Sequence, residues 1–231
     1  KGATHMSTQA PSLPSAATIR QKHKEFMLPA VANLYQEPLV FAEGKGARLT
    51  DVDGKQYLDF FGGILTISLG HGHPRVQNAI SAQMQRLNHI STLYPSIPMV
   101  ELAEKLVGIA PKNLKKAYFL ASGTEADEMA FLLAQVFTGR QEVLALRHGY
   151  SGRSLLALSL VGLSNYRAVP AQVAGIKHVM SPYCYRCPYK MEPKTCGVHC
   201  AKDIEDVIKT QTTGKIAGML VEPIQGAGGF I

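Results

Sequence analysis

The chain has 231 residues, a formal net charge of +7 at neutral pH, 46% hydrophobic residues and 18% charged ones. This composition is typical of a globular protein, and the length allows one large domain or two small ones. No run of 18 apolar residues occurs, and the N-terminus lacks the order of a signal peptide, so a membrane partner is not expected. The basic residues are mostly scattered rather than clustered with aromatics, so a nucleic-acid partner is not expected either.

The N-terminal part of the chain predicts one helix and a small antiparallel sheet. Residues 18–29 form a helical pattern that ends at a proline. The alternating stretch that follows predicts strands over residues 40–42, 47–52 and 56–59, with Asp53-Gly54 as a hairpin turn.

From residue 74 onward the pattern is helical and then alternates between strands and helices. Proline opens a predicted helix over residues 74–89 and another over residues 98–109. The remaining predicted elements are strand 117–121, helix 124–138, strand 142–147, a helix near 152–163, strand 176–180, helix 202–211 and strand 216–221. This order predicts an α/β fold with a mostly parallel sheet and helices on both faces.

A small-residue turn, Ser122-Gly123-Thr124, joins a predicted strand to a predicted helix. A helix N-terminus offers free backbone N–H groups and a positive dipole end, and glycine lets the backbone approach an anion closely. Ser122 and Glu125 also satisfy the capping-box pattern, so an ordinary helix cap explains the same residues. Taken alone, the turn leaves the phosphate cradle and the cap equally open.

Two further segments follow predicted strands: His148-Gly149-Tyr150-Ser151-Gly152-Arg153-Ser154 and Glu222-Pro223-Ile224-Gln225-Gly226. With Ser122-Gly123-Thr124-Glu125-Ala126, and with Gly70-His71-Gly72-His73-Pro74 upstream, they resemble the first half of a class III aminotransferase over about residues 25 to 231. Such a protein is a pyridoxal-phosphate (PLP) enzyme of fold type I. Because ligands of parallel sheets bind beyond the C-terminal strand ends, the three segments are expected to meet at one site.

The resemblance implies a role for each matching residue. Ser122, Gly123 and Thr124 correspond to the phosphate loop, Tyr150 to the aromatic residue that stacks on the cofactor ring, and Glu222 to a glutamate near the phenolic oxygen of the cofactor. For the substrate, Arg153 corresponds to a carboxylate-binding position and Ile64 to a pocket residue.

The same resemblance predicts the domain organisation. Residues 1–17 are expected to be a tag followed by a mobile arm, residues 18–70 an N-terminal segment of the small domain, and residues 71–231 the first part of the PLP-binding large domain. The chain is expected to be truncated, because the Schiff-base lysine and the aspartate at the pyridinium nitrogen match no residue here. A homodimer is expected as well.

Two departures from the family pattern affect the expected chemistry. Asp127 stands where the family usually has asparagine, and its side chain is expected to point away from the cofactor. Ala227 stands where 2-oxoglutarate-dependent members carry glutamate, which favours a small acceptor such as pyruvate or glyoxylate. Arg153 favours a dicarboxylate instead, so a 4-aminobutyrate or ornithine type of aminotransferase is the alternative.

All four cysteines lie in one segment: Cys184, Cys187, Cys196 and Cys200. Their spacing allows a tetrahedral zinc site, although free thiols are the more ordinary interpretation. A cytoplasmic location, expected here, disfavours a disulfide. The expected function is transfer of an amino group from an amine or amino acid to a small 2-oxo acid. An inactive fragment and a zinc-stabilised binding module are the alternatives.

Overall fold

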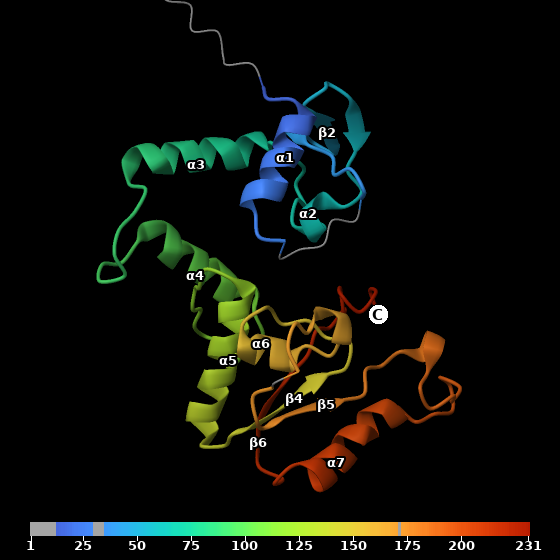
Figure 1. The fold of residues 1–231 in the computed structure, drawn as a ribbon. Helices are drawn as coiled ribbons and strands as arrows, with labels where there is room; N and C mark the ends of the chain where they lie inside the picture. Colours follow the sequence, from blue (N-terminus) through green and yellow to red (C-terminus); the bar gives the residue numbers. More distant parts are fainter. Residues whose placement is uncertain (1–12, 30–34, 171) are drawn as a thin grey trace, which may run out of the picture. The chain divides into compact units, whose positions relative to one another are not determined.

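The structure, a computed structural model, describes residues 13–29, 35–170 and 172–231 and divides into two units (Figure 1). The first unit ends at Ile97 and the second runs from Pro98 to Ile231. The expected domain boundary between residues 70 and 71 lies inside the first unit. The expected tag and most of the expected arm lie outside the described residues, and the arm's last two residues belong to helix α1 (Ala16–Phe26).

The first unit contains the small antiparallel sheet that the sequence predicts. Its strands are β1 (Phe41–Lys45), β2 (Arg48–Asp51) and β3 (Gln56–Leu58), in that order. The hairpin turn between β2 and β3 is held by Asp51, whose Oδ1 accepts the N–H groups of Asp53 at 3.1 Å and Lys55 at 2.8 Å. Gly54 takes a φ of +84°, which suits glycine, so the predicted turn is confirmed.

Two helices follow this sheet, α2 (Gly62–Leu65) and α3 (Pro74–Arg86), the second beginning at the predicted proline. The segment between them is tied to the sheet by a two-way backbone pairing of Gly46 with His71. The His71 Nε2 also lies 2.7 Å from Asp59 Oδ2. This hydrogen bond, with backbone donors from Phe61 and Gly62, lowers the pKa of Asp59.

The second unit is built on a parallel sheet in which β4 (Glu142–Leu146) lies between β5 (Ile176–Val179) and β6 (Ile216–Leu220). Its helices are α4 (Ile97–Ile109), α5 (Gly123–Thr138), α6 (Leu155–Leu160) and α7 (His199–Gln211), with short 3-10 turns η1 (Ser164–Tyr166) and η2 (Cys184–Arg186). The parallel sheet and the strand–helix alternation confirm the predicted α/β class.

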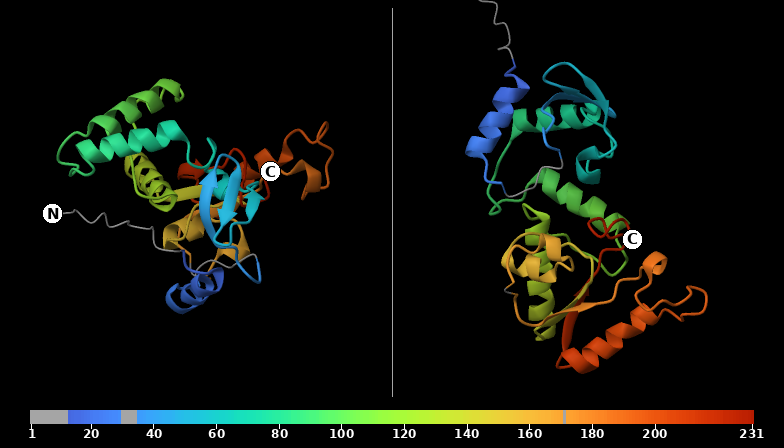
Figure 2. Two further views of the ribbon diagram at one scale, coloured as in Figure 1. Left: turned by 90° about the horizontal axis from the view of Figure 1, so that it is seen from above. Right: turned by 45° about the vertical axis from the view of Figure 1, so that its right-hand side comes forward.

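Helices cover both faces of this sheet, as Figure 2 shows. Successive residues of β4 point to opposite faces. Val143 and Ala145 pack with Phe131 of α5 and Leu160 of α6. On the other face, Leu144, Leu146 and Val179 pack with Val207 of α7. The core therefore lies in two layers around β4.

One predicted strand is wrong. Residues 117–121 lie outside the helices and strands, although the run is apolar and Leu120 is half-buried. Apolar content reports burial, whereas a strand also needs a neighbour with which to exchange backbone hydrogen bonds. Within the described residues, the ladders of β4 run only to β5 and β6.

None of the helices in residues 13–29, 35–170 and 172–231 is both long enough and apolar enough to span a bilayer.

Candidate functional site

The N-terminus of α5 is capped by its own side chains. Ser122 Oγ accepts the N–H of Glu125 at 3.2 Å, and Glu125 Oε2 accepts the N–H of Ala121 at 2.9 Å. The helix cap is therefore real. It does not displace the phosphate interpretation, because a Cβ added to Gly123 would meet no atom within 4 Å. The first helical residue thus borders open space that an anion could enter.

The loop after β4 is docked onto this helix start. Thr124 Oγ1 accepts the N–H of Arg153 at 3.3 Å, and the hydroxyl of Ser154 donates to the carboxylate of Glu128. Gly152, at a φ of +130°, lies so close that an added Cβ would be 2.2 Å from Thr124 Oγ1. Glycine at this position lets the two segments touch.

The turn after β6 holds the same loop from the other side. Glu222 Oε1 accepts the N–H of Tyr150 at 2.6 Å, and its Oε2 accepts the N–H of Gly226 at 3.1 Å. The buried Gln225 donates its amide N–H to the carbonyl of Arg147 at 2.8 Å. These two bonds join residues that are 72 and 78 positions apart in sequence. They connect the loops at the C-terminal ends of neighbouring parallel strands.

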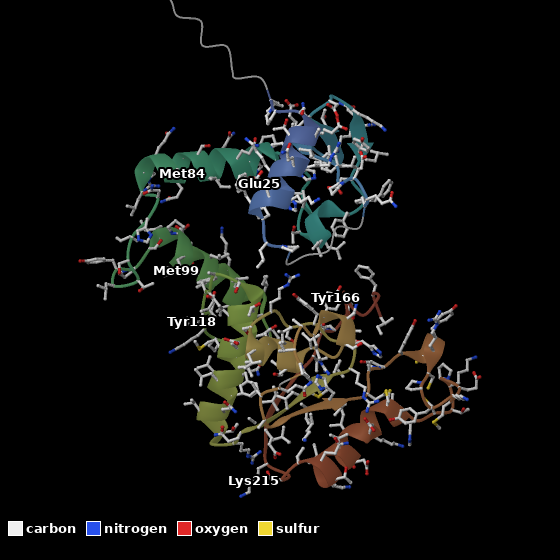
Figure 3. The ribbon with its side chains drawn as sticks, in the orientation of Figure 1. Glu25, Met84, Met99, Tyr118, Tyr166 and Lys215 are labelled. Atoms are coloured by element: carbon white, nitrogen blue, oxygen red, sulfur yellow. The ribbon has the colours of Figure 1, made fainter. Side chains whose placement is uncertain are left out.

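A cavity of about 90 Å³ lies among these segments. It is lined by Asp127 of α5, by the ends of β4 and β6 with Leu160, and by the two loops: Ala145, Leu146, Gly149, Tyr150, Ser151, Leu220, Val221 and Glu222. The ring of Tyr150 packs edge-on against Tyr166 of η1, labelled in Figure 3, with 5.2 Å between centroids. The predicted convergence of the three segments is therefore observed.

Asp127 lines the cavity together with Glu222. The expectation that its side chain points away from the cofactor stays a prediction. Partial burial raises the pKa of Asp127, and the negative charge of Glu222 raises it further. The sequence places Asp127 on a helix next to the phosphate turn, but the face it occupies depends on how α5 packs on the sheet.

The comparison with known proteins agrees with this geometry. The family model described as "Aminotransferase class-III" matches residues 30–231. The chain belongs to the class III aminotransferases.

Its relatives include several aminotransferases of different named substrates. The Arabidopsis thaliana protein "Alanine--glyoxylate aminotransferase 2 homolog 2, mitochondrial" is 38% identical over 218 residues, which cover 94% of this chain and 45% of the relative. The "Probable 4-aminobutyrate aminotransferase" of Bacillus subtilis is 35% identical, covering 94% and 50%. The class III chain thus spans about half the length of the curated relatives it matches.

Solved structures show the same relationship. An (S)-enantioselective omega-transaminase from Thermomicrobium roseum matches with a TM-score of 0.84 and 29% identity, over 95% of this chain and 52% of that one. An amine transaminase from an uncultivated Pseudomonas species, in its PLP-bound form, matches with a TM-score of 0.82 and 31% identity, over 90% and 50%. The fold is accordingly that of the fold type I PLP-dependent transferases.

The two predicted substrate residues belong to different units of this class III chain. Arg153 is exposed, and its backbone is fixed against Thr124 by the bond described above. Ile64 belongs to the first unit, where its side chain is exposed and its φ is +61°. A β-branched residue rarely adopts this left-handed conformation, which makes Ile64 a strained position. Its role in a substrate pocket stays a prediction.

The structure brings together the four cysteines, for which the sequence allows either free thiols or a zinc site. All four cysteines are free thiols, and they line one small cavity together with His199. Within the described part of the chain, no group of three or more His, Cys, Asp or Glu side chains is arranged to hold a metal ion. Free thiols and a zinc site both stay predictions for this segment.

Two features of the site were not predicted from the sequence. Gly152 is required by its contact with Thr124, and Gln225 bridges the two strand-end loops. Both residues belong to segments that the sequence singles out. Their partners lie 28 and 78 positions away, so only the packed structure identifies the contacts.

Proposed function

We propose that the protein to which this chain belongs is a PLP-dependent aminotransferase, which transfers an amino group from an amine or amino acid to a small 2-oxo acid. The observation that carries the proposal is the link between Tyr150 and Glu222, 2.6 Å from backbone nitrogen to carboxylate oxygen, beside the capped start of α5. This arrangement places Tyr150 and Glu222 on one cavity, and the loop that carries Tyr150 is hydrogen-bonded to Thr124 at the start of α5.

The residues present fit the phosphate and ring of the cofactor. Ser122, Gly123 and Thr124 would hold the phosphate, because the space beside Gly123 is open and the helix dipole favours an anion there. Tyr150 would face the ring, and Glu222 fixes the loop that carries Tyr150. When bound, PLP supplies an aldehyde that reacts with amines and a ring that accepts electron density.

For the acceptor we favour pyruvate or glyoxylate. Ala227 offers no carboxylate with which to pair an arginine in the pocket, and an unpaired buried arginine would be costly. The alternative, a 2-oxoglutarate-dependent enzyme of the 4-aminobutyrate or ornithine type, is supported by Arg153 because a guanidinium suits a second carboxylate. Relatives named for both kinds of reaction match the chain.

A homodimer and a cytoplasmic location are further proposals. Exposed apolar residues within residues 65–69 and 94–99 support the homodimer: Leu65, Ile67, Leu69, Tyr94, Ile97 and Met99. Four free thiols support a reducing compartment. Sedimentation of the full-length protein and cell fractionation would test the two proposals, and an active monomer would contradict the first.

The experiment that tests the main proposal is cofactor and half-reaction chemistry with the full-length protein. We expect PLP to bind with a visible absorbance band, and the amine form of the cofactor to react with pyruvate or glyoxylate faster than with 2-oxoglutarate. A higher kcat/KM for 2-oxoglutarate would instead favour the alternative acceptor. If the full-length protein does not bind PLP, the aminotransferase proposal fails, and stoichiometric zinc without PLP would point to a binding module.

A further inference from the structure

Tyr150 lines the cavity after β4, and its backbone and its ring are held by different neighbours. Glu222 Oε1 accepts the Tyr150 N–H at 2.6 Å, which fixes the backbone. This bond does not fix the ring, because the χ2 torsion of a tyrosine has broad minima unless neighbours restrict it. The ring of Tyr166 packs edge-on against the Tyr150 ring, with 5.2 Å between centroids and 68° between planes. The orientation of the Tyr150 ring therefore depends on Tyr166.

Tyr166 ends the 3-10 turn η1, on a segment that is bonded to the loop that carries Tyr150. Gly162, just before this turn, exchanges two backbone hydrogen bonds with that loop. Its carbonyl accepts the N–H of His148 at 3.2 Å, and its N–H donates to the carbonyl of Gly149 at 2.9 Å. A Cβ added to Gly162 would lie 2.5 Å from the His148 nitrogen, so glycine lets the two backbones touch. The segments that carry the two rings are thus packed directly against each other.

Arg167 fixes the other end of η1. Its Nε and Nη2 both donate to the carbonyl oxygen of Val161, at 2.9 and 2.6 Å, and Val161 is the fully buried residue that caps the C-terminus of α6. The same Nη2 lies 3.4 Å from Nε2 of His178 on β5. Hydrogen bonds from a charged donor are among the stronger ones in proteins. Because Arg167 directly follows Tyr166, this anchor limits how far Tyr166 can move away from Tyr150.

We propose that Tyr166 is a positioning residue, which holds the Tyr150 ring in the orientation that faces the cofactor ring. Tyr166 acts through Tyr150 and needs no contact of its own with the cofactor. The inference rests on the proposed function, because it takes Tyr150 to be the residue that faces the cofactor ring. It goes beyond that function by giving a role to η1, which lies outside the three segments that the sequence singles out.

Pre-organisation sets the expected size of the effect. A side chain that is fixed before binding loses less conformational entropy when a ligand packs against it, and immobilising one side chain on binding reduces affinity by roughly 2- to 13-fold. Tyr166→Leu removes the aromatic edge and keeps an apolar side chain, so we expect it to raise the cofactor Kd by roughly this factor. Tyr166→Phe keeps the ring and loses only the hydroxyl group, so we expect it to bind as the wild type does.

The test measures the Kd of pyridoxamine phosphate, the amine form of the cofactor, in the cofactor-free full-length protein. This probe is chosen because it binds without covalent attachment. The decisive comparison repeats Tyr166→Leu in a Tyr150→Leu background. If Tyr166 acts through Tyr150, the fold-change in Kd falls to about one in that background, which is what a double-mutant cycle detects. Tyr185→Leu removes an exposed tyrosine from the other 3-10 turn, η2, and as the matched control should keep the wild-type Kd.

A second measurement needs no ligand. In the cofactor-free protein, NMR should show nuclear Overhauser contacts between the ring protons of Tyr150 and Tyr166, and Tyr166→Leu should shift the Tyr150 ring resonances. Absence of these contacts overturns the inference, as does an unchanged Kd in Tyr166→Leu or an equal fold-change with and without the Tyr150 ring. A Tyr166→Phe variant that binds as weakly as Tyr166→Leu also overturns it, because the hydroxyl group would then be responsible. These results leave the proposed function intact, whereas a wild type that binds no pyridoxamine phosphate contradicts both.

Discussion

Gly123 precedes Thr124 in the chain, and Gly152 lies against the Thr124 side chain. The two glycines are expected to respond oppositely to replacement by alanine. Gly123 borders open space at the start of α5, whereas Gly152 is pressed against Thr124. Gly123→Ala adds a methyl group where the protein has no atom within 4 Å. Gly152→Ala adds one 2.2 Å from an oxygen and 2.8 Å from a carbon of Thr124. Gly123→Ala therefore tests ligand space, and Gly152→Ala tests packing.

The magnitudes follow from these surroundings. Alanine at position 123 restricts the unfolded chain and suits a helix, so we expect a gain of about 0.5 to 1 kcal/mol in the free energy of unfolding. Alanine at position 152 must displace Thr124 at a cost of about 1 to 3 kcal/mol. It also weakens the bond from Arg153 N–H to Thr124, worth about 0.5 to 1.5 kcal/mol. For a chain of this size each kcal/mol shifts the Tm by about 2 to 4 °C.

Cofactor affinity should separate the variants again. In Gly123→Ala the new methyl group occupies the space through which a phosphate would approach the backbone N–H groups. Loss of one hydrogen bond to a charged group, about 1.5 to 3 kcal/mol, would raise the Kd for PLP by roughly 10- to 150-fold. The assays are thermal unfolding without ligand and titration with PLP. A Gly123→Ala variant that is stable and binds PLP as the wild type does would refute the phosphate assignment.

Three other substitutions test single contacts. Thr124→Ala should weaken PLP binding by about 1 kcal/mol, measured by titration, and unchanged affinity would count against a phosphate contact there. Asp59→Asn should destabilise the fold at neutral pH. Because His71 lowers the pKa of Asp59, the difference in unfolding free energy between wild type and variant, measured in urea, should shrink as pH falls below 3.8. A difference that stays constant with pH would contradict this. Leu160→Ala, 1% exposed, should cost about 2 to 5 kcal/mol, whereas Leu155→Ala, 54% exposed, should cost much less; equal losses would contradict the core assignment.

Local patterns in the sequence were sufficient to predict most of the elements. Turn and cap residues act through their nearest neighbours, so Asp53-Gly54, Pro74 and Ser122 were correctly placed. The strands of the parallel sheet were predicted because apolar runs alternated with helical periodicity. Residues 117–121 show the limit of this reasoning, since an apolar run does not reveal whether a partner strand lies beside it.

The site was predictable in its segments but not in its contacts. The rule that parallel strands end at one edge was enough to bring Tyr150 and Glu222 together. It did not say which face of α5 meets them, because a shift of one helical residue turns a side chain by about 100°. The position of Asp127 on the cavity and the contact of Gly152 with Thr124 were therefore not predicted.

The contacts among the three segments imply that the site is shaped before any cofactor arrives. The carboxylate of Glu222, the hydroxyl of Thr124 and the amide of Gln225 each fix a loop through a backbone group of the loop after β4. Since these bonds are made within the protein, ligand binding does not have to order the loop, and the entropy of ordering it does not reduce the affinity. The opening beside Gly123 is different, because no protein atom fills it. Rigid walls around one open approach to a helix N-terminus are what a phosphate-anchored cofactor requires, and this combination favours cofactor binding over a purely structural helix cap.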